Sequence, residues 1–173
     1  MARKSHSSPA IRLGREARGE RLGGFIYGTI IALSVLVAGT KAYPNDAARI
    51  AALVAVSSVV FWLAHVYAHG LARTVAADEH LSLAELRRIA RHEGSIVEAA
   101  LPPVAALLLG AFGVLSTRAA VWVAFGIGLT VLVLQGITFA RVERLGRLGT
   151  LAVVSLNLAL GTALVGLKLL VTH

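Results

Sequence analysis

The sequence predicts an all-α fold: a polytopic integral membrane helical bundle of five transmembrane helices, with one short amphipathic helix at the membrane interface. Apolar residues make up 57% of the 173 residues, and the mean hydropathy is +0.76. Five runs without a charged residue have close to the length of about 20 residues that a helix needs to cross a bilayer. None shows the alternation of an outer-membrane β-strand, and hydrocarbon does not tolerate an unpaired backbone, so each run is expected to be helical.

We expect one transmembrane domain over residues 22–172, preceded by a basic cytoplasmic tail over residues 1–21. The tail combines Ser and Pro with five Arg and one Lys, a composition typical of a poorly ordered segment that lies against anionic headgroups. The spans are expected at about residues 22–40, 48–71, 95–117, 119–140 and 148–170.

The distribution of positive charge predicts the orientation. Thirteen of the 17 Lys and Arg fall on the side of the N-terminus, before residue 22, between residues 73 and 91 and between residues 141 and 147. By the positive-inside rule the N-terminus is cytoplasmic and the C-terminus lies outside, in the cytoplasmic (inner) membrane. The expected partner of these charges is the lipid bilayer with its anionic inner-leaflet headgroups, and not nucleic acid. The chain has no cysteine, which excludes disulfides and thiolate chemistry.

The connections carry turn and capping signals. The external segment Tyr43-Pro44-Asn45-Asp46 is typical of a turn in which Asn45 or Asp46 caps the second span. In the long cytoplasmic connection, Ser82 and Glu85 have the spacing of a capping box and predict an interfacial amphipathic helix over about residues 83–93.

A second Ser-x-x-Glu pair, Ser95 and Glu98, is expected to cap the third span. Small residues within the spans predict faces where two helices approach closely. These residues are Gly24, Gly28, Gly126, Gly128, Gly161 and Gly166.

Polar residues of four spans are expected at one depth. His65 and His69 stand one turn apart near the cytoplasmic end of the second span. Tyr27, Glu98 and Gln135 fall at a similar level in the first, third and fourth spans. Because ionisable groups within a membrane are costly and usually functional, we predict a cytoplasmic-side polar pocket formed by these five residues.

The same residues allow other interpretations. His65, His69 and Glu98 have the ligand chemistry of a divalent metal site, and further His and Glu follow nearby at His80, Glu85, His92 and Glu93. The histidines are also compatible with an aromatic belt that includes Trp62 and Tyr67. Gln135 and Asn157 are also compatible with simple hydrogen bonding between helices.

Two short motifs resemble a known family. Arg21-x3-Phe25-x2-Gly28 opens the first span and Phe61-Trp62-x2-His65 ends the second, a combination similar to the lysosomal and prokaryotic leak potassium channels. The resemblance implies a homo-oligomeric channel lined by the first helix, with Arg21, Phe25, Trp62 and His65 supporting helix packing. The chain departs from the family where Ile26 and Tyr27 replace a Ser-Asp pair, and where five spans replace six.

Three functions follow from these observations. The first is a small-cation channel or transporter, for potassium or protons, with His65, His69 and Glu98 at its cytoplasmic mouth. The second is a metal-dependent membrane-embedded enzyme that uses the same three residues, and the third is a non-catalytic membrane subunit. No catalytic triad, phosphate loop or nucleic-acid module is present in the sequence, so transport is favoured over catalysis.

Overall fold

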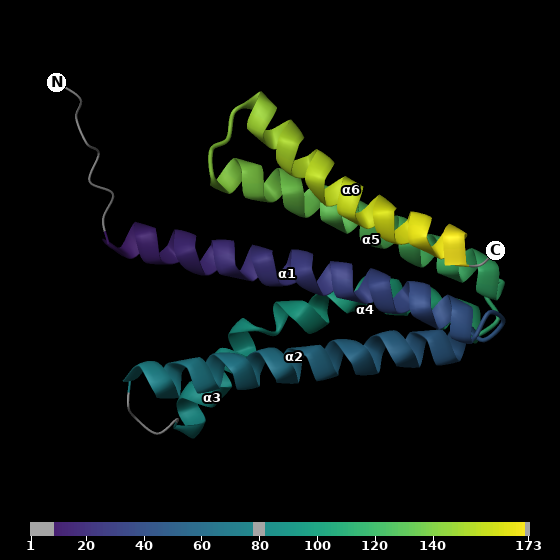
Figure 1. Cartoon of the computed structure of the whole chain (residues 1–173), viewed down its shortest axis with the longest axis horizontal. Coiled ribbons are helices and arrows are strands. Elements are labelled where there is room, and N and C mark those ends of the chain that lie inside the picture. Colours follow the sequence, from purple (N-terminus) through teal and green to yellow (C-terminus); the bar gives the residue numbers. More distant parts are fainter. Residues whose placement is uncertain (1–8, 78–81, 172–173) are drawn as a thin grey trace.

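The computed structural model of the chain describes residues 9–77 and 82–171, and these residues form an all-helical bundle without a strand (Figure 1). The all-α prediction is confirmed. The six helices are α1 (Pro9–Ala42), α2 (Ala47–Ala77), α3 (Leu83–His92), α4 (Ser95–Ala111), α5 (Thr117–Val142) and α6 (Arg147–Val171).

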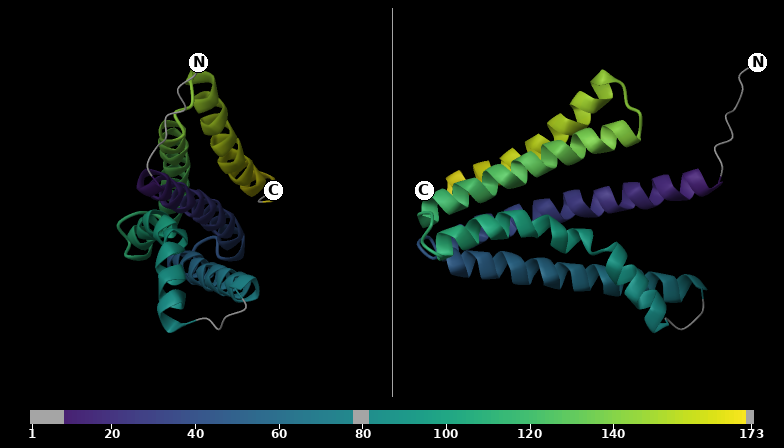
Figure 2. Two further views of the ribbon diagram at one scale, coloured as in Figure 1. Left: turned by 90° about the vertical axis from the view of Figure 1, so that its left-hand side faces the viewer. Right: turned by 180° about the vertical axis from the view of Figure 1, so that it is seen from behind.

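Helix α1 is central to the arrangement. It packs against α2 and α4 on one side and against α5 and α6 on the other, while α4 also contacts α2 and α5. Figure 1 and the rear view in Figure 2 show α2 and α3 on one side of α1 and the α5–α6 hairpin on the opposite side. The position of α1 matters for function because its polar side chains can reach residues of several other helices.

Three of the described helical segments are long and apolar enough to cross a membrane: Arg21–Ala42, Ala47–Val75 and Thr117–Val142. A fourth span results if α3 and α4, which meet at a bend of 44°, are counted as one. The described apolar part of α6, Arg147–Ala163, is shorter. The chain therefore has the helices of a membrane protein, and the five-span arrangement and its orientation remain predictions.

Helix α1 begins earlier than expected. It starts at Pro9, whereas we expected a poorly ordered tail as far as residue 21. Pro suits the first position of a helix, and the segment that follows is rich in Ala, Leu, Arg and Glu, which are strong helix formers. The segment is polar enough to remain in water, and although Gly14 and Gly19 lower its helix propensity, it contains no proline after Pro9. Residues 1–8 of the expected tail, and residue 172 of the expected domain, lie outside the described residues.

Two of the expected caps are confirmed. Asp46 Oδ1 accepts the backbone N–H of Arg49 at 2.9 Å, immediately before α2. Ser82 and Glu85 form the reciprocal capping box of α3, so the amphipathic helix lies where its sequence signal placed it.

The expected capping box of α4 is wrong. The residue before α4 is Gly94, which has no side chain to cap the helix, and Ser95 is already the first helical residue. The break between α3 and α4 spans only Glu93 and Gly94, which leaves no room for Ser95 to adopt the extended conformation of an N-cap.

Glycines of α1 permit its close contact with α4. A Cβ at Gly24 would lie 2.5 Å from Ser95 Oγ, and one at Gly28 would lie 2.6 Å from the backbone oxygen of Ile96. Gly128 faces Leu33 and Gly161 faces Leu129 in the same way, whereas Gly126 and Gly166 have no atom within 4 Å. Four of the six small residues thus lie at helix contacts, as the sequence predicted.

Hydroxyl groups inside the bundle bond within their own helices. Thr29 Oγ1 donates to the carbonyl of Phe25 at 2.9 Å, and Ser34 Oγ donates to the carbonyl of Ile30 at 2.8 Å. Thr40 Oγ1 likewise donates to a carbonyl one turn earlier in α1. Because each donor is satisfied locally, these polar residues require no partner on another helix.

Candidate functional site

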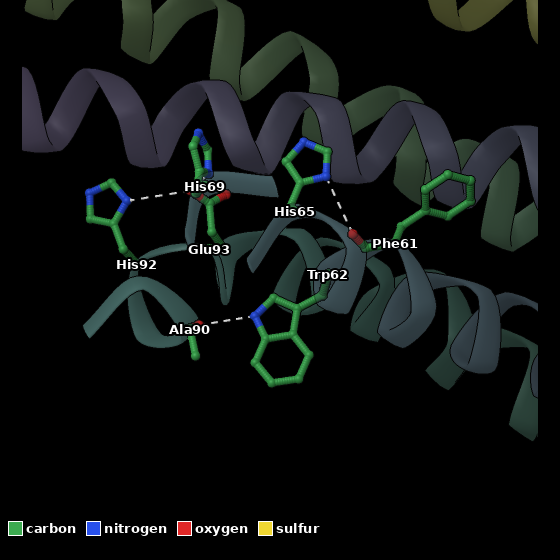
Figure 3. Close-up of polar contacts among 7 residues, drawn as sticks. All are labelled: Phe61, Trp62, His65, His69, Ala90, His92 and Glu93. Atoms are coloured by element: carbon green, nitrogen blue, oxygen red, sulfur yellow. Dashed lines mark hydrogen bonds and ion pairs between the residues drawn. The ribbon is translucent and has the colours of Figure 1, made fainter. Parts of the chain in front are cut away.

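Ionisable and aromatic residues of α1, α2 and the α3–α4 junction meet beside the second half of α2. We call Tyr27, His65, His69, His92 and Glu93 the histidine cluster. His65 and His69 are four residues apart and so lie on the same side of α2. Figure 3 shows His69 and His92 directed at the carboxylate of Glu93, with His65 one turn along α2.

The shortest contact of the cluster joins His69 to Glu93. His69 Nδ1 lies 2.9 Å from Glu93 Oε1, and His92 Nδ1 lies 3.9 Å from the same oxygen. The Glu93 side chain is 13% exposed, whereas that of His69 is 56% exposed. A doubly protonated imidazole forms an ion pair in this position, and a neutral one with its proton on Nδ1 donates a hydrogen bond. The pair can therefore exist with and without an additional proton.

His65 connects this pair to α1. Its ring centroid lies 5.0 Å from that of Tyr27 and 6.2 Å from that of His69. Its Nδ1 lies 3.3 Å from the carbonyl oxygen of Phe61. Tyr27, His65, His69 and Glu93 consequently lie in a row from α1 across α2 to the end of α3, with ring contacts between the first three and a direct polar contact between His69 and Glu93.

A hydrogen bond from Trp62 fixes the end of α3 near α2. Trp62 Nε1 donates to the carbonyl oxygen of Ala90 at 2.9 Å (Figure 3), and the neighbouring Ile89 is buried. Glu93 follows directly as the C-cap of α3, where its backbone N–H donates to the carbonyl of Ile89. These contacts hold the Glu93 carboxylate against His69.

Glu98 pairs with Arg21 and not with the histidines His65 and His69. Arg21 Nη2 donates to Glu98 Oε2 at 3.0 Å, which joins α1 to α4 through two side chains that are 66% and 49% exposed. Among the described residues no three His, Asp or Glu side chains form a group that could hold a metal ion. The structure therefore does not assemble the divalent metal site expected from His65, His69 and Glu98, because Arg21 binds the carboxylate that the site would need.

Gln135 is carried by a helix that is separate from those of the histidine cluster. It belongs to α5, which lies on the opposite side of α1 from most of α2 (Figure 1). The amide that does join two helices is Asn157, whose Nδ2 donates to the carbonyl oxygen of Leu132 at 3.2 Å. Of the five residues expected in one pocket, the structure brings together Tyr27, His65 and His69.

Glu93 is the residue that the pocket prediction left out. The sequence placed it near the histidines but gave no reason to choose it over Glu98. The sequence feature that could have identified Glu93 is the capping box at Ser82. A helix that begins after Ser82 and runs for three turns ends at Glu93, next to α2. His80, in the same connection, lies outside the described residues.

Comparisons with protein-family models, with curated proteins and with solved structures find no match to this chain. The resemblance to leak potassium channels thus rests on its two short motifs. Of their residues, Arg21 and Trp62 make the contacts to α4 and α3 described above, and Phe25 is partly buried in α1.

Proposed function

We propose that this protein is a membrane transporter or channel for a small cation, and that the histidine cluster binds the cation at the cytoplasmic end of the pathway. The observation that supports this proposal most directly is the pair of His69 and Glu93 at 2.9 Å, with His69 inside the apolar segment Ala47–Val75. Ionisable side chains in such a segment are costly, and in membrane proteins they commonly mark ion pathways and proton relays.

The proposal includes five membrane spans, with the N-terminus in the cytoplasm. Helix α6 supports the fifth span because its 25 residues extend over about 37 Å, longer than a hydrocarbon core of about 30 Å. The excess of Lys and Arg at the start of α1, in α3 and around the turn between α5 and α6 supports the orientation. In this arrangement the histidine cluster faces the cytoplasm.

The chemistry of the cluster favours the proton over potassium. Potassium sites are usually built from rings of carbonyl oxygens, whereas this cluster is made of imidazoles, a phenol and a carboxylate. Histidine as a residue type changes charge between pH 5 and 8. A transporter that uses such groups is expected to have a rate that depends on pH within this range.

The test is proton flux into liposomes that contain the purified protein. Proton uptake driven by a potassium gradient with valinomycin is followed with an enclosed pH dye, and potassium flux is measured separately. We expect uptake in the unmodified protein that changes between pH 5 and 8. His69→Ala and Glu93→Gln should each lower it by about ten-fold or more, a loss within the range for positioned proton-transfer groups.

Glu143→Gln is the matched control, since Glu143 is an exposed carboxylate at the C-cap of α5 and its loss changes the net charge equally. We expect it to leave the flux unchanged. Absence of flux in the unmodified protein, or flux that neither cluster variant alters, would contradict the proposal and favour the non-catalytic membrane subunit. Potassium flux without proton flux would reassign the cation.

A further inference from the structure

We propose that α3 is a binding surface for anionic lipid headgroups, and that it transmits headgroup binding to the histidine cluster through Glu93. The first half of this inference concerns α3 alone. The second half rests on the proposed function, because it names a regulator of the same site.

The two sides of α3 differ in what covers them. Leu83, Leu86 and Ile89 recur every third residue and share one side of the helix. Ile89 is 5% exposed and holds α3 to the bundle, while Leu83 is 70% and Leu86 38% exposed. The start of α3 thus presents one leucine that is largely exposed and a second that is exposed in part.

Arginines without an acidic partner among the described residues lie beside these leucines. Arg87, Arg88 and Arg91 are exposed, and within the described part of the chain none of them forms an ion pair. Of the described carboxylates of this segment, Glu85 is engaged by the cap at the start of α3 and Glu93 by His69. Among the residues that the structure describes, three arginines of one short helix thus have no ion-pair partner.

Exposed leucines next to exposed arginines match the chemistry of a bilayer surface with anionic headgroups. The leucines can enter the boundary of the acyl chains, and the guanidinium groups can bind phosphates just above it. The position of α3 favours lipid over an acidic protein partner, because only Glu93 and Gly94 separate it from α4. If α4 crosses the membrane as the span expected over residues 95–117, α3 lies at headgroup level at its cytoplasmic end.

Glu93 connects this surface to the histidine cluster. It is the C-cap of α3, and its carboxylate contacts His69. A change in how deeply α3 sits in the headgroup layer therefore moves the carboxylate relative to the imidazole. Anionic lipid that holds α3 in the described position keeps the pair together, and neutral lipid is expected to hold it less firmly.

Trp62 provides a local reporter, because its indole is bonded to Ala90 of α3. The chain has two tryptophans, so a Trp122→Phe background leaves Trp62 as the only one. Full-length protein is reconstituted in phosphatidylcholine with increasing amounts of brominated phosphatidylglycerol or brominated phosphatidylcholine. Quenching of Trp62 by each lipid gives the relative affinity of the surface for the anionic headgroup.

The decisive variant replaces Arg87, Arg88 and Arg91 together by Gln. One basic residue near an anionic surface contributes about 1 kcal/mol, which is about five-fold in affinity. We expect the preference for phosphatidylglycerol to fall at least about five-fold. The matched control replaces Arg141, Arg144 and Arg147 by Gln, which removes the same charge near the α5–α6 turn, and Trp62 quenching should not change.

Equal quenching by the two lipids in the unmodified protein, or equal losses in the two triple variants, would overturn the lipid site. Competition by soluble glycerol phosphate would instead identify a site for free phosphate and also overturn it. The second half is tested by proton flux in vesicles of phosphatidylcholine alone or of an equimolar mixture with phosphatidylglycerol. We expect faster flux in the mixture, and only in protein that retains the α3 arginines.

The outcomes separate the two proposals. Quenching that prefers phosphatidylglycerol without any flux would refute the proposed transport function and leave the lipid site standing. Flux that is the same in both vesicles, while the quenching preference is present, would refute the link through Glu93 alone.

Discussion

Replacement of Gly28 by alanine tests whether α1 and α4 pack as closely as the structure shows. A Cβ at this position would lie 2.6 Å from the backbone oxygen and 2.8 Å from the Cα of Ile96, and 3.1 Å from the Cβ of Ala99. Ordinary contact begins at 3.4 Å, so the two backbones would have to separate by up to 0.8 Å. Backbone atoms cannot turn aside as the end of a flexible side chain can.

The expected cost follows from this geometry. Adding a methyl group to a closely packed site typically destabilises a protein by about 1–3 kcal/mol, and the higher helix propensity of alanine offsets up to about 1 kcal/mol. We therefore expect Gly28→Ala to lower the free energy of unfolding by about 1–2 kcal/mol. The separation would also lengthen the contact between Arg21 and Glu98, which joins the same two helices one to two turns away.

The assay is unfolding of the purified protein by sodium dodecyl sulfate in mixed micelles, followed by loss of far-ultraviolet circular dichroism. Gly126→Ala is the matched control, because it makes the same change in a membrane-spanning helix with no atom within 4 Å of the new methyl group. We expect the control to be as stable as the unmodified protein or slightly more stable. If the two variants have the same stability, the close approach of α1 and α4 is refuted.

Three further predictions concern the turns and the helix contacts. Gly113 and Arg144 follow α4 and α5 with positive φ values of 75° and 53°, a conformation that glycine adopts more easily than other residues. Gly113→Ala should therefore destabilise the protein by about 1 kcal/mol, and Arg144→Gly should stabilise it by a similar amount. The same melting temperature for both variants would contradict this. Asn157→Ala removes the bond from α6 to the Leu132 carbonyl and should cost about 0.6–1.7 kcal/mol in the same unfolding assay, with no loss expected if the two helices are held by packing alone. Asp46→Ala removes the cap of α2 and should cost about 0.5–2 kcal/mol, whereas Asp46→Asn should retain most of the stability.

Local signals in the sequence predicted much of the fold. The capping box at Ser82 and the cap at Asp46 depend on residues within one helical turn, and both are present. The close contacts at Gly24 and Gly28 were predicted because a missing side chain on an apolar helix is useful mainly where another helix approaches. The start of α1 at Pro9 is harder to predict, because the charged residues before residue 22 are typical of a disordered tail and also have high helix propensity.

The site was only partly predictable because depth along a helix does not give the direction of a side chain around it. Glu98 and His69 were expected at one level, but the glycines of α1 bring Arg21 onto α4, and Arg21 binds Glu98 instead. Gln135 belongs to a helix on the other side of α1 from the cluster. Glu93 lies at the break where the helix axis turns by 44° between α3 and α4, and no short sequence pattern encodes that angle.

The local hydrogen bonds of the α1 hydroxyls have a consequence for biosynthesis. During translation α1 leaves the ribosome before α4 and α5 have been synthesised. It is therefore present in the lipid for a time without the helices that later surround it. Thr29, Ser34 and Thr40 already donate to carbonyls of α1 itself, so these three hydroxyl donors are satisfied in the isolated helix before any other helix is present. We therefore expect the translocon to release α1 into the bilayer as a stable single helix, and assembly of the bundle to follow when α4 is inserted.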